Sequence, residues 1–574
     1  MQKKTNRLLF FKIVICIFIL TLVKLIVTAR IPILPLVYAS ADDNWAVSLA
    51  ENLSCLQWLG PYTHMTLIKR IGFPMLLAVL YRLGIPYTVA VTLLYSTGTG
   101  IFAWGLFPLY KNSLKGWKWA VFVLCLALVI FNPSTWSAAG LQRIYRNSIT
   151  SFQLLWIMGG FFGLYFRRRE AVKKQLLIMI FGVSLPAVWF LGTREDSVYL
   201  YVFLLAASVI LALGYFLIFR EKKETAAFLL KRLSLFLILL GMILIVPQGI
   251  RTINKGVYGI PTVTELSDSH FSDCIEALYA IDMPEEEGFL VTIPRAKFRK
   301  AAEVSPAFAT ILPELDYFYE TWYEPAPLEG ERTNGLVFWY VREAAAKHGY
   351  HEDAVTADTF YKTCAEEIRS AFRDGRLPEK KTKALSALIP PFGPEVFPDT
   401  LKYTGTAITW VLSFEDCMSQ YLEHDYPEDL VKRFEKFSHC RAVTKELPAS
   451  LHRLILFTAQ YKDVYRIVHS AFLIFSLAGY GWLLARCIIQ KRHKRKLSEE
   501  ARGTLLTGLA LLLMFLLICG IVGFNSSVNV YSVGTIYLLG AYPMIALFAA
   551  AGIISLAVLA EKAIRERHPG ADRT

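Results

Sequence analysis

Acidic residues are scarce in the apolar parts of this chain, and they gather at a few points. Of 47 Asp and Glu residues, 33 fall between residues 251 and 462, which leaves 14 for the rest of the chain. Because an ionisable group near a bilayer is costly to desolvate, its presence there favours a functional role. Five carboxylates flank long apolar segments, namely Asp42, Asp43, Glu51, Glu195 and Asp196.

The first cluster lies in ASADDNWAVSLAENL, residues 39–53. The adjacent carboxylates of Asp42 and Asp43 are suited to general-base chemistry or to holding a divalent cation. A structural alternative is that Ser40, Asp42 or Asp43 caps the following helix, since a side-chain oxygen there accepts the free N–H groups of the first turn. The cluster taken alone favours capping.

The second cluster is LGTREDSVYL, residues 191–200, a short polar turn between two apolar segments. The planar guanidinium of Arg194 is suited to gripping a phosphate, and Glu195 or Asp196 would orient it or bind a metal ion. The alternative is an ion pair between the arginine and a carboxylate of the same turn, with no role beyond closing the turn.

A third group is basic. Lys69 and Arg70 lie in TLIKRIGFPML, and Arg143 and Arg146 lie in LQRIYRNS. Loops on the outer side of a membrane are usually poor in Lys and Arg, so these residues require anionic partners. Three kinds of partner stay open: the carboxylates of the first two clusters, lipid head groups, and a phosphate-bearing lipid substrate.

Membrane-spanning helices must position these side chains. The chain has 574 residues, 55% of them hydrophobic, and a mean hydropathy of +0.41, which is too apolar for a soluble protein. A span needs about 20 mostly apolar residues. That rule predicts an α-helical polytopic membrane protein with spans near residues 8–28, 86–110, 117–133, 149–166, 175–192, 198–219, 231–250, 463–487, 504–523 and 533–559.

Basic residues cluster in alternate loops between the predicted spans, as in 167–169 and 491–496. Since positive loops are retained on the cytoplasmic side, both termini are predicted to be cytoplasmic. The net charge of +14 does not indicate a nucleic-acid partner, because the positive charge lies in these loops. Four segments then share the outer face: 29–85, 134–148, 193–197 and 251–462.

Residues 251–462 carry a net charge of −9 and predict a mainly α-helical extracytoplasmic domain. It separates an N-terminal membrane module, 1–250, from a C-terminal one, 463–574. In the first module, residues 43–85 are expected to form helices along the membrane interface. The extracytoplasmic domain also has four cysteines, which in an oxidising compartment would allow two disulfides in any of three pairings or stay free thiols: Cys274, Cys364, Cys417 and Cys440.

Several of these features together resemble the GT-C superfamily of membrane glycosyltransferases, including protein mannosyltransferase and aminoarabinose transferase relatives. Asp42 and Asp43 match the acidic pair after the first span of that superfamily, and KRIGFPMLLAVLYRLGIPY, from Lys69, resembles its Lys, Gly, aromatic and Pro stretch. TREDSVY, YLLGAYPMIALFAAAGI and EVSPAFATILPELD are similar to segments of a bacterial, largely uncharacterised subset. Arg70 and Ile71 depart from the pattern, since small residues are common there.

The resemblance implies a GT-C-like fold and an inverting glycosyltransferase in the bacterial cytoplasmic membrane. Its donor would be a polyprenyl-phosphate-linked sugar on the outer face, its acceptor a glycan, lipid or protein, and its surroundings membrane lipids. Asp42 or Asp43 would deprotonate the acceptor hydroxyl.

The same resemblance implies how the leaving phosphate is stabilised. Lys69, Arg194 and one of Arg143 or Arg146 would bind it, with Glu195 and Asp196 lining the same site. A divalent metal ion stays open as a cofactor.

Two other classes of protein are alternatives. A transporter or lipid flippase would need polar residues along a path through the bilayer, whereas the predicted spans are nearly free of charge. A non-catalytic scaffold or receptor would leave the acidic pair as helix caps and the basic residues apart in space.

Overall fold

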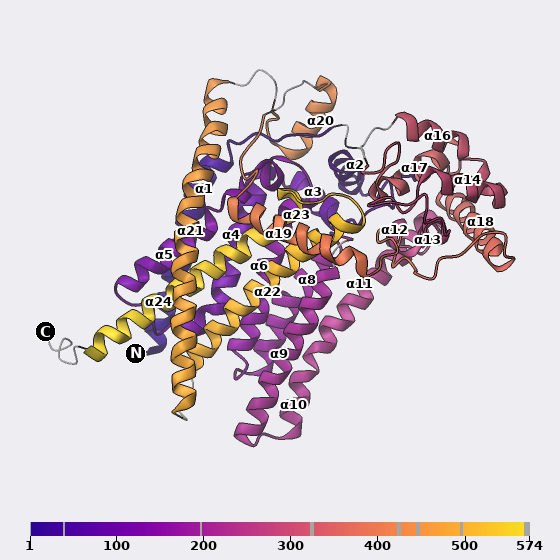
Figure 1. The fold of residues 1–574 in the computed structure, drawn as a ribbon. Helices are drawn as coiled ribbons and strands as arrows, with labels where there is room; N and C mark the ends of the chain where they lie inside the picture. The colour runs from indigo at the N-terminus through magenta and orange to yellow at the C-terminus, as the bar shows by residue number, and fades with distance from the viewer. Residues whose placement is uncertain are drawn as a thin grey trace.

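A computed structural model describes residues 2–37, 39, 41–195, 198–321, 326–421, 426–443, 448–493 and 498–567. Within these ranges the chain is built from helices, four isolated β-bridges occur, and no strand is formed. Figure 1 shows most helices gathered in one bundle, with a smaller helical group at one end of it.

In the described part of the chain, nine helices are long and apolar enough to cross a membrane, or up to ten if a bent pair counts as one span. An α-helical, multi-pass membrane protein is therefore confirmed. The nine spans are built from α1 (Gln2–Thr28), α4 (Tyr87–Tyr110), α6 (Thr150–Phe166), α7 (Val172–Leu177) with η4 (Ile178–Ser184) and α8 (Leu185–Leu191), α9 (Val198–Lys222), α10 (Ala226–Leu233) with α11 (Leu235–Tyr258), α21 (Ala449–Arg492), α22 (Glu499–Val528) and α24 (Ala541–Arg567).

The third predicted span, 117–133, is the bent one. Helix α5 (Trp117–Ile130) ends before Pro133, and the chain turns by 45° into the short helices of residues 133–142. Proline has no N–H to continue the helix, and the side chain of Asn132 accepts a hydrogen bond from the N–H of Ser134 instead. The bend leads the chain to Arg143, one of the residues of the candidate site.

Close packing of α4 on α6 depends on glycines. A Cβ added at Gly105 would lie 2.3 Å from the carbonyl oxygen of Gly159, and one at Gly98 would lie 3.0 Å from that of Phe152. Small residues allow two spans to approach this closely, because lipid supplies no hydrophobic force to press them together. The contact fixes the start of α6 beside α4.

The outer surface of the bundle is apolar. Phe18 on α1, Leu205 on α9 and Ile245 on α11 expose 61%, 69% and 70% of their surface. Long helices that expose many large apolar side chains are typical of spans surrounded by lipid.

The helices at the end of the bundle form what we call the inserted domain, α12 to α18. Its members are α12 (Glu265–Asp268), α13 (His270–Ala280), α14 (Arg295–Val304), α15 (Pro306–Ala309), α16 (Leu312–Thr321), α17 (Asn334–Lys347) and α18 (Ala354–Arg373). Figure 1 places them beside α2 (Asp43–Ser54) and near α3 (Gly72–Leu83), which occupy the stretch predicted to hold interfacial helices.

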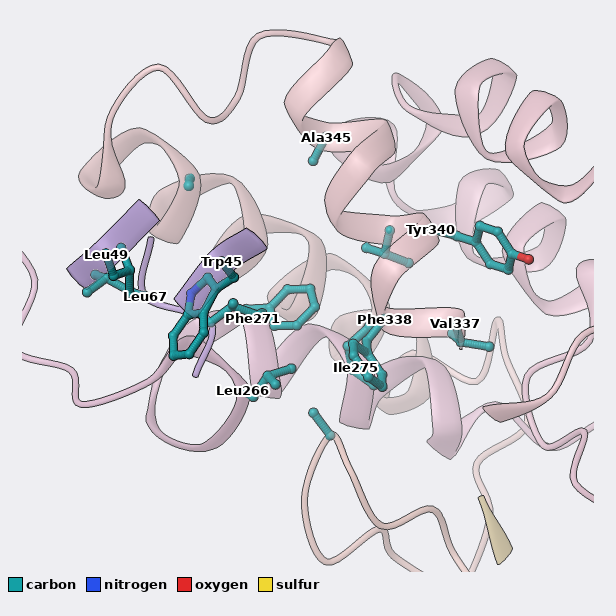
Figure 2. Close-up of a cluster of buried hydrophobic side chains, with 14 of the residues drawn as sticks. Trp45, Leu49, Leu67, Leu266, Phe271, Ile275, Val337, Phe338, Tyr340 and Ala345 are labelled. Carbon is teal, nitrogen blue, oxygen red and sulfur yellow. The ribbon is translucent and has the colours of Figure 1, made fainter. Parts of the chain in front are cut away.

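The inserted domain and α2 share one hydrophobic core. Figure 2 shows Trp45 of α2 beside Phe271 of α13, with Leu67 and Leu266 close by. The indole N–H of Trp45 donates to the carbonyl oxygen of Met65 at 2.9 Å, which fixes the ring in that core. The inserted domain is thus packed onto the segment that carries the first acidic cluster.

Three further helices complete the fold: α19 (Phe397–Ser413), α20 (Glu428–Ser438) and α23 (Thr535–Leu538). Helix α19 packs along α22, and its Ala407 and Val411 are buried among residues of the spans. The boundaries 1–250, 251–462 and 463–574 stay a prediction, and inside the middle segment α19 belongs to the core of the bundle.

Candidate active site

The loop before Asp42 is held by backbone pairing. The N–H of Ile33 donates to the carbonyl oxygen of Arg441 at 2.9 Å, and its own carbonyl accepts from Val443 at 2.8 Å. On the other side, the N–H of Leu34 donates to the carbonyl oxygen of Gln142 at 2.9 Å. The loop therefore lies between the chain ahead of α21 and the chain that leads to Arg143.

The side chain of Asp42 does not cap the helix that it precedes. Asp42 is the N-cap residue of α2, yet it makes no side-chain capping hydrogen bond. Its Oδ1 instead accepts a hydrogen bond from Lys69 Nζ at 2.6 Å, and its Oδ2 lies 3.7 Å from Arg143 Nη2. Capping is thus not the role of this carboxylate, and Ser40, another of the three residues suited to capping, lies outside the described residues.

Asp43 faces a different partner. Arg143 donates to Asp43 through Nη2 at 2.5 Å and through Nε at 3.4 Å, and the Asp43 side chain is fully buried. A fork of two hydrogen bonds fixes both the position and the plane of the guanidinium. Asp43 therefore anchors Arg143, while the Asp42 side chain exposes 38% of its surface.

Lys69 lies at the centre of the cluster. Its buried Nζ donates to the carbonyl oxygen of Ala41 at 2.5 Å as well as to Asp42. The ammonium also lies 5.7 Å from the ring centroids of both Tyr145 and Trp339, within the range of a cation–π interaction. A lysine ammonium carries three N–H groups, and the two acceptors in the described part of the chain use two of them.

Glu195 joins the second cluster to the basic group. Its Oε1 accepts a hydrogen bond from the backbone N–H of Arg70 at 2.6 Å, and its Oε2 pairs with Arg146 Nη1. The same turn touches the chain at Gly72, whose N–H donates to the carbonyl oxygen of Gly192 at 2.8 Å. A Cβ at Gly72 would lie 2.7 Å from that oxygen, so only glycine permits this approach.

The two adjacent aspartates differ in acidity. Burial alone would raise the pKa of Asp42, but Lys69, followed by Arg143 and Arg146, holds it below its usual range. Burial raises the pKa of Asp43 to about 6, because the opposing effect of Arg143 is smaller. Burial likewise lowers the pKa of Lys69, although Asp42 opposes that shift.

Six of the eight sequence-predicted site residues thus form one connected cluster: Asp42, Asp43, Lys69, Arg143, Arg146 and Glu195. Arg194 is buried against the start of α6, where its Nη1 lies 3.3 Å from Thr150 Oγ1. Asp196 lies outside the described residues. The basic residues of the cluster therefore have the acidic residues as partners, one of the three kinds of partner left open by the sequence.

Three aromatic residues of the site were not among the predictions. Tyr145 lies between Arg143 and Arg146, with the two guanidinium carbons 5.0 and 5.6 Å from its ring centroid. Burial, then Tyr145 and Asp42, raise the pKa of Tyr537 to about 12, so its hydroxyl lies in the field of the cluster.

A sequence signal existed for two of these aromatic residues, because Tyr537 is the first residue of the segment YLLGAYPMIALFAAAGI. Tyr145 stands within LQRIYRNS, between Arg143 and Arg146, which the sequence analysis selected as candidate site residues. Tyr537, on α23, and Trp339, on α17, are hundreds of residues away from Lys69 along the chain, and only the fold brings them near it.

The described residues do not fit a divalent metal ion. They contain no group of three or more His, Cys, Asp and Glu that would hold one. The carboxylates of Asp42 and Asp43 are bonded to cationic side chains, whose positive charge disfavours a second cation at the same oxygens.

Comparison with known proteins assigns no family to the chain. No protein-family model matches the chain, and no relative is found among curated proteins.

Proposed function

We propose that this protein is an inverting glycosyltransferase that moves a sugar from a polyprenyl-phosphate donor to an acceptor on the outer face of the membrane. One observation supports the proposal most: a partly exposed carboxylate, Asp42, lies near three cationic side chains, of which Arg143 and Arg146 are held in place by the shielded carboxylates of Asp43 and Glu195. Such a site offers a proton acceptor next to a region that stabilises a departing anion.

Asp42 is the better candidate for the base. Asp43 is fully buried and its two oxygens are taken by Arg143, whereas Asp42 is open to a ligand. The distance of 3.7 Å from Asp42 Oδ2 to Arg143 is too long for a hydrogen bond, so this oxygen can accept the proton of an acceptor hydroxyl. The lowered pKa of Asp42 keeps the carboxylate ionised at neutral pH.

The cations are suited to the leaving phosphate. Lys69 retains one N–H beyond its bonds to Asp42 and Ala41 in the described part of the chain, and Arg143 and Arg146 both place a planar guanidinium group near the ring of Tyr145. Because Asp43 and Glu195 fix these arginines before substrate arrives, little reorganisation accompanies the reaction.

In the proposed reaction, the acceptor oxygen forms a bond to the anomeric carbon on the face opposite the phosphate. Its proton passes to Asp42 Oδ2. The bond between that carbon and the phosphate oxygen breaks, and its electron pair leaves with the polyprenyl phosphate, which the cations stabilise. The configuration at the anomeric carbon is inverted.

The spans contain little that supports the alternative function of a flippase. Lys24 of α1 is a fully buried lysine within a span, which is the kind of residue a transport path would use. Its Nζ, however, donates to the carbonyl oxygen of Ile130 at 2.8 Å and to Thr135 Oγ1 at 2.5 Å. These bonds hold the bend after α5, so Lys24 has a structural role there.

The proposal can be tested in an expressing strain without knowing the sugar. Asp42→Asn should leave the donor unused, so that its polyprenyl-phosphate monosaccharide accumulates in lipid extracts and the surface glycan loses one sugar residue by mass. Asp429→Asn, an exposed substitution on α20, is the matched control and should change neither pool. Unchanged donor and glycan in the Asp42→Asn strain, with the protein present in the membrane, would refute the proposed activity.

A further inference from the structure

Helices α13 and α18 of the inserted domain pack side by side. The rings of Phe271 and Tyr361 make an edge contact with centroids 4.8 Å apart. Three residues further along each helix stand Cys274 and Cys364, both fully buried. Since residues three apart lie on one face of a helix, the aromatic contact and the two cysteines share the same interface.

Polar contacts on both sides of this pair fix the register. His270 Nδ1 lies 2.7 Å from Asp358 Oδ2 at the start of the two helices. Arg369 of α18, beyond Cys364, reaches back to Asp273 of α13, with Nη2 donating to Oδ1 at 3.0 Å. Within this helix pair the side chains of Cys364 and Cys274 are close enough to interact.

The other two cysteines predicted in the extracytoplasmic domain have separate surroundings. Cys417 is buried among residues of the spans, near Tyr542. The Sγ atom of Cys440 lies 3.6 Å from Thr88 Oγ1, at the start of α4. Of the three pairings open from the sequence, only the one that joins Cys274 to Cys364 fits these positions.

We propose that Cys274 and Cys364 form a disulfide in the mature protein, whereas Cys417 and Cys440 remain thiols. The proposal rests on the outer location assigned to the inserted domain under the proposed function, because disulfides persist in oxidising compartments. It does not depend on glycosyl transfer.

The step is a thiol–disulfide exchange with a protein or small-molecule disulfide as the oxidant. Each cysteine loses its proton, a bond forms between the two sulfur atoms, and the two electrons reduce the oxidant disulfide to two thiols. Interaction with the Cys274 side chain, together with burial, raises the pKa of Cys364, so the reactive thiolate is scarce in the folded domain. The bond is therefore expected to form while the domain folds, and burial then protects it from reductants.

A bridge at this place has a consequence for the candidate site. It closes a loop of about 90 residues, a length for which a cross-link restricts the unfolded chain strongly. That loop contains α17, which carries Trp339 beside Lys69. The disulfide would thus hold together the part of the inserted domain that reaches the acidic and basic cluster.

The state of the thiols can be read from the full-length protein. Cells are quenched in acid, and the protein is denatured, alkylated without reductant, purified in denaturing detergent, digested and analysed by mass spectrometry. We expect a linked pair of peptides containing Cys274 and Cys364, with Cys417 and Cys440 alkylated. Alkylated Cys274 and Cys364 would overturn the proposal, as would a bridge that involves Cys417 or Cys440.

A second measurement distinguishes an error in the cysteine pairing from an error in the side of the membrane assigned to the inserted domain. Val355, at the start of α18, exposes 49% of its surface, so Val355→Cys in a Cys55→Ser background should react with a membrane-impermeant maleimide on intact cells. If that cysteine is labelled while Cys274 and Cys364 are alkylated, the pairing is wrong. If it is labelled only after the cells are opened, the outer location is wrong, and the proposed disulfide and the proposed function fail together.

Discussion

Asp42 and Asp43 are neighbours in the chain, yet their side chains have opposite surroundings. One is open and bonded to Lys69, and the other is buried and bonded to Arg143. Adjacent residues at a helix start point in different directions, which is how a pair of identical residues comes to hold two different roles. Sequence could predict the pair but not which member does what, because burial decides it.

Substitution of each aspartate should separate the two roles. Asp42→Asn removes the proposed base and should lower the rate of transfer by about 10²–10⁴-fold at every pH, the usual contribution of a general base. Asp43→Asn keeps one hydrogen-bond acceptor for Arg143 and should lower the rate less. The ratio of the two rates, measured as donor consumed by purified variants, checks this assignment. Equal losses would mean that the two carboxylates act as one unit.

The pH dependence of the same reaction should report Asp43. Its pKa of about 6 means that it becomes protonated as the pH falls through that value, and Arg143 then loses its charged anchor. We expect the rate to fall below about pH 6 in the wild type and to lose this acid limb in Asp43→Asn. A wild-type rate that is flat between pH 5 and 7 would contradict the assignment.

The free energy of unfolding should change with pH in the opposite direction to the rate, because of the same carboxyl group of Asp43. A carboxyl whose pKa is raised by folding binds its proton more tightly in the folded state than in the unfolded chain. The contribution of Asp43 to the free energy of unfolding therefore increases as the pH falls from about 6 toward its usual value near 3.8. Activity and thermal stability should consequently diverge over that range, and Asp43→Asn should remove the divergence.

At the scale of elements, the site depends on a close approach between two loops. The segment that carries Lys69 and Arg70 meets the turn of residues 191–195 through Gly72, and the bend after α5 delivers Arg143 and Arg146. The bend was not predicted, since residues 117–133 were expected to form one span, although Pro133 is a local signal for it. The direction of Arg194 could not be predicted, because its partner at Thr150 belongs to another helix.

Gly72→Ala should therefore damage the site without touching any of its charged residues. A methyl group at Gly72 would meet the carbonyl oxygen of Gly192 at 2.7 Å, so the two loops must separate and Glu195 must move away from Arg70. We expect a displacement on the order of 1 Å, which typically costs about 100-fold in rate. The matched control is Gly100→Ala on α4, where the nearest atom lies at 3.8 Å. Equal rates of donor consumption for the two variants would contradict this account.

A buried ion pair inside the inserted domain, Arg342 with Glu265, also bonds the loop that precedes Lys69, through the carbonyl oxygen of His64. Arg342 of α17 donates to the carbonyl oxygen of His64 at 2.9 Å and to Glu265 Oε2 at 2.5 Å, and the side chains of Arg342 and Glu265 are almost fully buried. Helix α17 is thus fixed to the loop that precedes Lys69. No sequence pattern predicts these contacts, because Arg342, Glu265 and His64 come from three segments that lie far apart in the chain.

Arg342→Ala should leave Glu265 as an uncompensated buried charge and cost about 3–5 kcal/mol of stability. Arg369→Ala is the control, since its pair with Asp273 is exposed by 41% and 38% and should contribute about 1 kcal/mol or less. Thermal unfolding of the two purified proteins in detergent, followed by tryptophan fluorescence, measures the difference. Similar melting temperatures would show that the buried pair does not hold the domain.

At the scale of the whole molecule, composition and charge predicted the class of protein, while long-range packing determined the site. Span positions follow from runs of about 20 apolar residues, and so they could be read from the sequence. The shared core of Trp45 and Phe271 could not, because nothing local links α2 to α13 (Figure 2). The result is that the inserted domain forms one wall of the site through Trp339, whereas the sequence indicated only that it would lie on the same face.

The most direct measurement is a reaction with purified protein in liposomes. The protein is incubated with a lipid extract that contains polyprenyl-phosphate monosaccharides and with acceptor glycans from the same cells, and released polyprenyl phosphate is quantified by mass spectrometry. Our account predicts release by the wild type and a release at least about 100-fold slower by Asp42→Asn, with binding of the donor retained. Release at the same rate in both proteins, or in neither, would contradict it.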